Sequence, residues 1–323
     1  MNKDTHFFGI DISKDVFDVS DSSGNHYQFN NSFSGFKSFK KLLNSSSHCV
    51  MEATGYYHIR LAYFLVENSF QVSVENPLKI KRFIQMNLSK IKTDKSDSKW
   101  ILDYGISQNP SLWFGTTKNQ QESLQLLRLL SLYTKQSTQI KNKIHGETIL
   151  GVPSKTVLQS LNRQLKSLKK ESEKLEELLL KNVKKEYSES LTLLQSIPGI
   201  GQKTAAILLV FTDGFNRFES YKELCSYAGI TPMIRTSGSS VKGRPKISKM
   251  GNAKLRNLLF MCSMNAYKYN NACKQLFDRL VAKGKSKKLA LIAVCNKLLK
   301  QAFSIVKNRI PYDENFRSVL LKN

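Results

Sequence analysis

The chain has 323 residues, 41% of them hydrophobic and 10% aromatic, which is enough to bury the cores of two folded domains and excludes a largely disordered chain. Its 50 Lys and Arg residues against 25 Asp and Glu residues give a formal net charge of +25, which predicts a polyanionic partner. Nucleic acid fits best, and a merely soluble basic protein is the alternative.

Three further features of the composition exclude classes of protein. The five cysteines form no C-x-x-C pair, and the five histidines form no H-x-x-x-H pair, so we expect reduced thiols and no zinc site. We find neither a signal peptide nor about 18 consecutive apolar residues, so we expect no membrane span. These features predict a cytoplasmic protein.

Short apolar runs separated by turn residues fill the first 76 positions. We expect, in chain order, strands at 7–12, 16–20 and 26–29, a helix from Phe33 to Leu43, a strand at 48–51, a helix through 59–66 and a strand at 71–74. The first three strands, joined by short turns, predict an antiparallel meander. The order β-β-β-α-β-α-β is that of the ribonuclease H-like α/β fold, which we expect over residues 1–115.

Four carboxylates in this region are candidate metal ligands. Asp11 lies inside an apolar run, Glu52 follows another, and Asp94 and Asp97 share one face of an expected helix. A buried carboxylate is tolerated where a cation neutralises it, and carboxylate oxygens suit Mg²⁺ or Mn²⁺ rather than zinc. Two such ions roughly 3.5–4 Å apart would support phosphodiester cleavage. For each acid alone, a strand-end or helix-cap role is the alternative. We interpret three further acids as turn or surface residues: Asp15, Asp18 and Asp21.

Residues 116–190 show a different pattern, with leucines at helical spacings among Lys, Glu, Gln and Ser. Gly151-Val152-Pro153 interrupts the pattern, and Ser154 can cap the second helix. We therefore expect a long antiparallel helical hairpin or coiled coil with solvated polar faces. Such a hairpin serves either as a plain linker or as a dimerisation arm.

The region 191–323 is expected to be a mostly helical domain, with helices at 204–211, 255–269, 273–283 and 289–307. Near its start, two glycines one residue apart precede a helix, in the form of a helix-hairpin-helix motif. Backbone N–H groups and a helix N-terminus at such a loop bind phosphate without reading a base. An ordinary tight turn is the alternative, and the spacing of a nucleotide P-loop is missing. The candidate phosphate-binding residues are Gly199, Gly201, Lys203 and Thr204.

An acid-free basic segment follows. No Asp or Glu occurs from Leu224 to Phe277, which indicates that this segment lies against phosphates or an acidic surface. The serine and glycine run 237–240 presents hydroxyls with little steric cover, beside cations that would stabilise an alkoxide or a phosphorane. A flexible loop is the alternative, since no nearby His or Asp supplies an evident base. The candidate nucleic-acid contacts of this segment are Arg235, Lys242, Arg244, Lys246, Lys249 and Arg256.

These motifs together resemble the DEDD-type insertion-sequence transposases of the 110/1111 family, also described as bridge-RNA-guided recombinases. The resemblance covers nearly the whole chain. In the first half it is carried by Gly9-Ile10-Asp11, Met51-Glu52-Ala53-Thr54-Gly55-Tyr56 and Lys92-Thr93-Asp94-x-x-Asp97. In the second half it is carried by Ser196-Ile197-Pro198-Gly199-Ile200-Gly201, Tyr227-Ala228-Gly229-Ile230-Thr231-Pro232 and Ser237-Gly238-Ser239-Ser240.

The resemblance implies specific roles for these residues. The domain at 1–115 would be RuvC-like, with Asp11, Glu52, Asp94 and Asp97 as the tetrad that binds Mg²⁺ or Mn²⁺. Ser237 would be the nucleophile that joins DNA through a phosphoserine link, with Ser239 and Ser240 as the other possible attackers. One position departs from the family, which usually has alanine where this chain has Ser98; we expect this small change to leave metal ligation undisturbed.

The resemblance also implies partners. The RuvC-like domain of one subunit would meet the serine domain of another, in a dimer or tetramer joined through the central helices. A structured bridge RNA would select donor and target DNA by base pairing. We therefore predict an enzyme, a DNA transposase or recombinase. Two alternatives stay open: a RuvC-like junction nuclease without a covalent intermediate, and a non-catalytic nucleic-acid-binding protein whose acids are structural.

Overall fold

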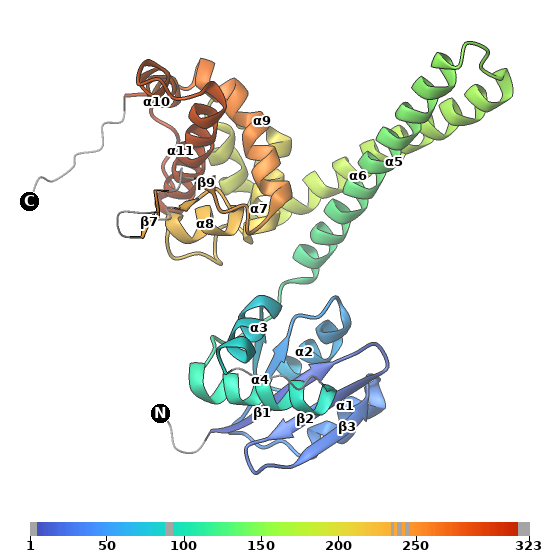
Figure 1. Ribbon diagram of the computed structural model, residues 1–323, viewed down its shortest axis with the longest axis vertical. Coiled ribbons are helices and arrows are strands. Elements are labelled where there is room, and N and C mark those ends of the chain that lie inside the picture. Colours follow the sequence, from blue (N-terminus) through green and yellow to red (C-terminus); the bar gives the residue numbers. More distant parts are fainter. Residues whose placement is uncertain (1–4, 88–92, 234–235, 238–240, 243–245, 316–323) are drawn as a thin grey trace, which may run out of the picture. The chain divides into compact units, whose positions relative to one another are not determined.

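The computed structural model describes residues 5–87, 93–233, 236–237, 241–242 and 246–315. The chain divides into two compact units, residues 1–116 and residues 117–323 (Figure 1). Within the described ranges, five residues are described by their backbone alone: Asp94, Thr236, Ser237, Val241 and Lys242.

The first unit is a mixed sheet with helices on both faces (Figure 1). Its strands are β1 (His6–Ile12), β2 (Val16–Asp21), β3 (His26–Asn30), β4 (Ser47–Glu52) and β5 (Gln71–Glu75). Its helices are α1 (Phe33–Lys40), α2 (Tyr57–Glu67), α3 (Pro77–Met86) and α4 (Asp94–Gln108). The strand order is β3-β2-β1-β4-β5; β2 is antiparallel to both of its neighbours, and β4 is parallel to both of its neighbours.

Alternation along the strands decides which face each helix covers. Phe8 of β1 is buried in a core that contains Phe39 of α1 and Leu61 of α2. Val50 of β4 belongs to the opposite face, where it packs in a second core with Ile101 of α4 and with side chains of α3. Helices α1 and α2 therefore cover one face of the sheet, and α3 and α4 cover the other.

The expected strands and the two expected helices of residues 1–76 are confirmed, and the mixed sheet is compatible with the predicted ribonuclease H-like fold. The interpretation of Asp18 and Asp21 as turn or surface acids is wrong. Both lie within β2 and are only 4% and 6% exposed. Because β2 lies between β1 and β3 and packs against α4, even its polar positions are covered. Asp21 still organises the next turn, since its Oδ1 accepts hydrogen bonds from the backbone of Ser23 and Asn25.

The second unit begins with the expected pair of long helices, α5 (Lys118–Ile149) and α6 (Lys155–Gln195), which lie against each other as a hairpin (Figure 1). Thr117 caps α5 by accepting a hydrogen bond from the backbone of Gln120. Ser154 occupies the N-cap position of α6, as expected, although its side chain makes no capping hydrogen bond. We call this hairpin the arm.

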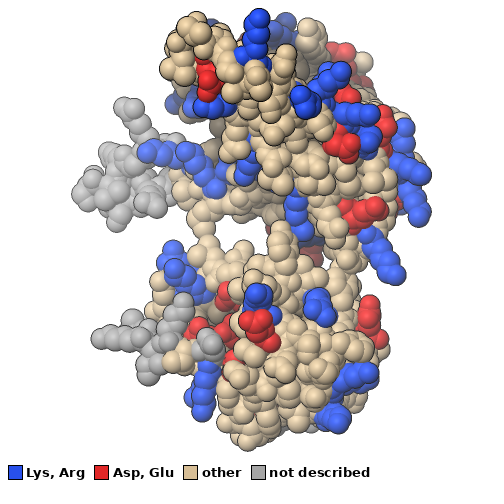
Figure 2. Space-filling view, turned by 90° about the vertical axis from the view of Figure 1, so that its right-hand side faces the viewer, with Lys and Arg blue, Asp and Glu red and all other residues tan. Residues whose placement is uncertain are grey.

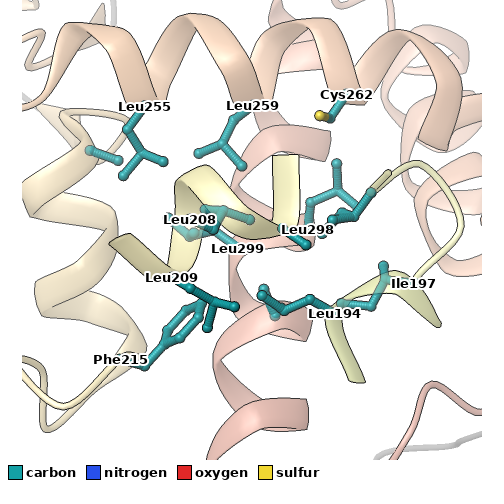
Figure 3. Close-up of a cluster of buried hydrophobic side chains, with 14 of the residues drawn as sticks. Leu194, Ile197, Leu208, Leu209, Phe215, Leu255, Leu259, Cys262, Leu298 and Leu299 are labelled. Atoms are coloured by element: carbon teal, nitrogen blue, oxygen red, sulfur yellow. The ribbon is translucent and has the colours of Figure 1, made fainter. Parts of the chain in front are cut away.

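The core of the second unit forms where the base of the arm meets the C-terminal helices (Figure 3). These helices are α7 (Gln202–Thr212), α8 (Tyr221–Ala228), α9 (Ala253–Tyr269), α10 (Asn271–Ala282) and α11 (Lys287–Asn308). Leu194 at the end of α6 packs in the same cluster as Leu209 of α7, Leu259 of α9 and Leu298 of α11. The expected helices α7, α9, α10 and α11 are confirmed, whereas α3 and α8 were not anticipated because each is short.

Two features of this core bear on the expectations from composition. All five cysteines are buried, and burial raises the pKa of Cys225 and Cys295 to about 11 and that of Cys273 to about 12, as expected of unreactive thiols. Among the described residues, one helix, α11, has the length and apolar composition to cross a membrane. Leu298 and Leu299 of α11 are fully buried in the core of the second unit, which is the packing of a core helix.

Candidate active site

Acidic residues occupy one level of the sheet, on the face that α4 covers. Asp11 of β1 is the register partner of Asp18 of β2, and Glu52 of β4 is the register partner of Glu75 of β5. In the pairing of β1 with β4, the last register partners are Ile10 and Met51. Asp11 and Glu52 each come one residue after them. Neighbouring strands lie about 4.8 Å apart, so four adjacent strands bring carboxylates side by side. We call these four residues the acidic row.

A glycine lets α4 lie directly on β1 next to the acidic row. A Cβ atom placed on Gly9 would lie 2.2 Å from the backbone nitrogen of Leu102 and 2.3 Å from the carbonyl oxygen of Ser98. Gly9 precedes Asp11 by two residues and therefore shares its face of the sheet. The first turns of α4 thus pass over the level of the sheet where Asp11 lies.

Ser98 fixes the first turn of α4 on the sheet. Its Oγ lies 2.8 Å from Oγ of Ser20, two residues from Asp18 on β2, and Ser98 is 0% exposed. Asp94, the first residue of α4, lies one turn before Ser98 and so on the same side of the helix. Asp97 is the residue before Ser98 and is half-buried. A capping box between Thr93 and Ser96 starts the helix at this point.

Asp18 and Glu75 of the row each have a basic or amide partner. Oδ1 of Asp18 lies 3.0 Å from Nε2 of His26, and both oxygens of Asp18 accept hydrogen bonds from the amide of Gln28 at 3.3 Å. Glu75 accepts a hydrogen bond from Lys79 at 2.9 Å, and this bond raises the pKa of Lys79. Sequence reasoning missed Asp18 and Glu75 as site residues. The sequence held a signal for Asp18, because it lies two residues from Val16 and from Ser20 in a strand with an alternating pattern. Such spacing puts Asp18 on one face of the sheet with both.

The remaining predicted ligands are half-buried or described by backbone. Asp11 and Glu52 are half-buried, and one Glu52 oxygen accepts a hydrogen bond from the hydroxyl of Thr54 at 3.1 Å. Among the described side chains, no three His, Cys, Asp or Glu residues gather closely enough to hold one metal ion. The side chain of Asp94 is outside that set. The acids of the row and of the start of α4 can offer carboxylate oxygens as metal ligands. Such oxygens suit a hard divalent cation.

Ser237, the predicted nucleophile, lies in the inner strand pair of a small β hairpin in the second unit. The outer pair of strands is β6 (Pro232–Met233) with β9 (Lys246–Ile247), and the inner pair is β7 (Thr236–Ser237) with β8 (Val241–Lys242). Ser237 is the register partner of Val241, and the run 238–240 between them lies outside the described residues. The expected loop is thus framed by strand pairing on both sides. Four of the candidate residues lie outside the described residues: Arg235, Ser239, Ser240 and Arg244.

Backbone and arginine contacts join α8, α9 and the two segments that flank this hairpin. Arg256 of α9 donates a hydrogen bond to the carbonyl oxygen of Ala228 at the end of α8, at 3.0 Å. The backbone nitrogen of Lys249 donates to the carbonyl oxygen of Gly229 at 3.1 Å. The side chains of Lys246 and Lys249 are exposed. Of these predicted DNA contacts, Arg256 therefore ties α9 to the end of α8, whereas the two lysines face solvent.

The loop between α6 and α7 places its two glycines differently. Gly199 has a φ of 102°, and a Cβ atom there would lie 2.7 Å from Cβ of Ala266, so this glycine allows the loop to pack against α9. Gly201 is the N-cap of α7, is exposed and has open space around it. The start of α7 is thus presented to solvent with its partial positive charge.

Lys203 and Thr204, in the first turn of α7, have partners within the protein. Lys203 forms an ion pair with Glu176 of α6. The hydroxyl of Thr204 lies 3.4 Å from Sγ of Cys262 on α9 and is half-buried. Thr204 therefore contributes to packing between α7 and α9.

Comparisons with known proteins agree on one family. A family model described as "Transposase IS116/IS110/IS902 family" matches residues 191–278, and a DEDD-type IS110 model described as "Transposase" matches residues 8–147. A "Pilin gene-inverting protein" of Moraxella bovis is 30% identical over 318 residues, 95% of this chain and 98% of the relative. The chain belongs to the IS110 family of transposases. The "Transposase for insertion sequence element IS1111A" of Coxiella burnetii is 24% identical over 327 residues, 91% of this chain and 88% of the relative.

Membership of the IS110 family confirms the prediction of an enzyme, a DNA transposase or recombinase. Its substrate is DNA, in keeping with the net charge of +25. The two family models cover both places at which the structure puts candidate chemistry. The acidic row and the start of α4 lie within residues 8–147, and the serine hairpin lies within residues 191–278.

Proposed function

We propose that this IS110-family transposase cuts and rejoins DNA with a divalent cation, Mg²⁺ or Mn²⁺, held by Asp11, Glu52, Asp94 and Asp97. The observation that carries the proposal is the shared level of Asp11 and Glu52 on parallel strands, with the first turn of α4 seated over the same face. Ligands in α/β sheets bind beyond the carboxyl ends of parallel strands, which is where these residues lie. When bound, the cation would neutralise charge on the attacked phosphate.

Ser237 is the proposed nucleophile. Its Oγ forms a bond to phosphorus as the bond from phosphorus to one neighbouring nucleotide oxygen breaks. The hydroxyl proton passes to a proton-accepting group. The leaving oxygen takes up a proton and becomes the free end of its strand. Attack by another strand end on the phosphoserine link restores the serine and rejoins DNA. The pairing of β7 with β8 supports this proposal, because it holds the backbone of Ser237 in a short strand pair.

The remaining proposals concern partners. The exposed lysines at the hairpin base and the N-terminus of α7 at Gly201 are proposed to contact DNA phosphates, together with Arg235, Lys242 and Arg244. A structured bridge RNA is proposed to choose donor and target DNA, in a dimer or tetramer in the prokaryotic cytosol or nucleoid. A transcript from the flanking DNA that purifies with the protein would check the RNA proposal.

The names of the relatives allow two outcomes of the same chemistry. Two relatives are named for inverting a pilin gene, and another is named for an insertion sequence. Cutting and rejoining through a serine link gives excision or inversion according to how the recombination sites are oriented. We propose excision and integration of an insertion sequence as the activity of this chain.

The test is recombination on a plasmid that carries the reading frame with its native flanking DNA. Asp11→Asn and Ser237→Ala are each expected to lower circle formation by at least about 100-fold, the usual scale for loss of a catalytic group. Matched controls are Asp15→Asn, an exposed acid of the adjoining turn, and Ser239→Ala and Ser240→Ala in the same run. A denaturing gel detects the protein–DNA adduct, and thermal melting with Mn²⁺ measures binding of the cation apart from activity.

Each result decides one part of the proposal. Persistence of circles and adduct in Ser237→Ala, with their loss in Ser239→Ala or Ser240→Ala, would move the nucleophile to that serine. Cleavage without any adduct would favour the junction-nuclease alternative. An equal Mn²⁺ shift of the melting temperature in the wild-type protein and in Asp11→Asn would remove Asp11 from the metal site.

A further inference from the structure

The distal half of the arm carries a large excess of positive charge. Between residues 123 and 170 the chain has one acid, Glu147, whereas all six acids of α6 lie between residues 171 and 189. Glu147 is itself in an ion pair with Lys143 at 2.6 Å. Nine cations lie in the same stretch: Arg128, Lys135, Lys141, Lys143, Lys155, Arg163, Lys166, Lys169 and Lys170. Figure 2, which faces the side on which the arm projects, shows basic side chains over much of the second unit, with acidic side chains among them.

An open groove of about 500 Å³ runs between α5 and α6 in this distal half. Its lining combines small hydroxyl and amide side chains with three exposed lysines, Lys141 of α5 and Lys166 and Lys169 of α6. Thr138 donates its hydroxyl proton to its own helix, as Thr134 does, so these side chains leave room in the groove rather than bind a ligand strongly. The lysines are therefore the groups that would bind an anion.

The composition of the groove selects the kind of anion. It has no aromatic side chain on which an unpaired base would stack, so it offers no platform for a single strand. Residues 162–172 of α6 span about 15 Å at 1.5 Å per residue. That length matches about four phosphates along one strand of a duplex. The lysine ammonium groups act as point charges, and over this length they suit the regularly spaced phosphates of a duplex.

We propose that the distal groove of the arm binds the phosphate backbone of duplex DNA, outside the site where strands are cut. The arm then does more than link or dimerise. Lys169 has a long ion pair with Glu173, at 3.9 Å between two well-exposed side chains, and such a pair is weak enough to open for a phosphate. Because DNA is the substrate of the family, this inference stands whether or not the proposed metal site and serine are right.

The test compares two triple variants of the full-length chain in fluorescence anisotropy with a 30-base-pair DNA duplex of arbitrary sequence. Lys141→Gln/Lys166→Gln/Lys169→Gln removes the groove lysines. The matched control is Lys181→Gln/Lys184→Gln/Lys185→Gln. It removes three exposed lysines from a second groove, which lies near the base of the arm and also contains Glu122. The distal variant is expected to weaken binding by about 10-fold or more at 0.1 M salt and to lower the slope of log K against log salt by about 2 to 3. The control is expected to lower that slope by less than about 1.

Three results would overturn the inference. Equal losses in the two variants would show that overall charge, not the groove, attracts DNA. A loss for an RNA duplex of the same sequence, with DNA binding unchanged, would show that the groove takes RNA. A change in oligomer mass of the distal variant by light scattering would show that these lysines act in assembly.

Discussion

At the scale of single residues, the clearest finding concerns Ser98, which follows Asp97, the last predicted metal ligand. We expected Ser98, which stands where the family usually has alanine, to leave metal ligation undisturbed. The structure pairs its buried hydroxyl with that of Ser20 at 2.8 Å, which gives Ser98 a role in packing. A buried hydroxyl needs a partner, so the two serines are expected to depend on each other. Ser98 thereby ties the turn that carries Asp97 to the strand that carries Asp18.

Ser98→Ala is expected to lower the free energy of unfolding of the first unit by about 1–2 kcal/mol, because it leaves the Ser20 hydroxyl without this partner. The Ser20→Ala/Ser98→Ala double variant should lose less than the sum of the single variants. Urea unfolding followed by tryptophan fluorescence measures this selectively, since both tryptophans, Trp100 and Trp113, lie in the first unit. The exposed Ser23→Ala is the control. Additive losses in the double variant would show that the two hydroxyls are not coupled.

At the scale of elements, close approach of α4 to β1 decides whether acids distant in sequence meet. The helix begins at a capping box and would form from local signals alone. Its seat on the sheet depends on the missing side chain of Gly9, which no periodic pattern of the sequence reveals. Packing of backbone on backbone leaves no room for adjustment.

Gly9→Ala is expected to destabilise the first unit by about 1–3 kcal/mol and to lower recombination, because the new Cβ would displace the helix that carries Asp94 and Asp97. Gly146→Ala is the matched control, since Gly146 lies inside α5 with open space around it. That change is expected to be neutral or to stabilise by up to about 1 kcal/mol. Tryptophan fluorescence reports the first variant and circular dichroism the second. Unchanged stability in Gly9→Ala would contradict the close approach of α4.

At the scale of the whole molecule, the chain consists of two units, each with its own core. The first unit ends in a segment that packs back on its own sheet. The backbone nitrogen of Trp113 donates to the carbonyl oxygen of Val72 at 2.7 Å, and the hydroxyl of Tyr63 bonds Thr116. These contacts lie beyond α4, so the unit is complete only at residue 116.

A fragment of residues 1–116 is therefore expected to fold alone, with a urea midpoint close to that of the tryptophan signal in the full chain. A fragment of residues 1–109 should be less stable by about 2 kcal/mol or more, because it lacks the half-buried indole of Trp113, which packs on the core, and the hydrogen bonds of Thr116. Circular dichroism follows both fragments. An unfolded 1–116 fragment would mean that the first unit needs the second in order to fold.

The sequence by itself determined the local structure and the chemical inventory. Alternation identified the strands, leucine spacing identified the arm and the long C-terminal helices, and charge pointed to DNA. These signals are periodic or compositional, so a short window of chain contains them. The tertiary structure alone decided that Asp18 and Glu75 share the level of Asp11 and Glu52, that Arg256 ties α9 to the end of α8, and that the arm has a basic groove. Each of these depends on burial and pairing between residues remote in the chain, which no window of sequence records.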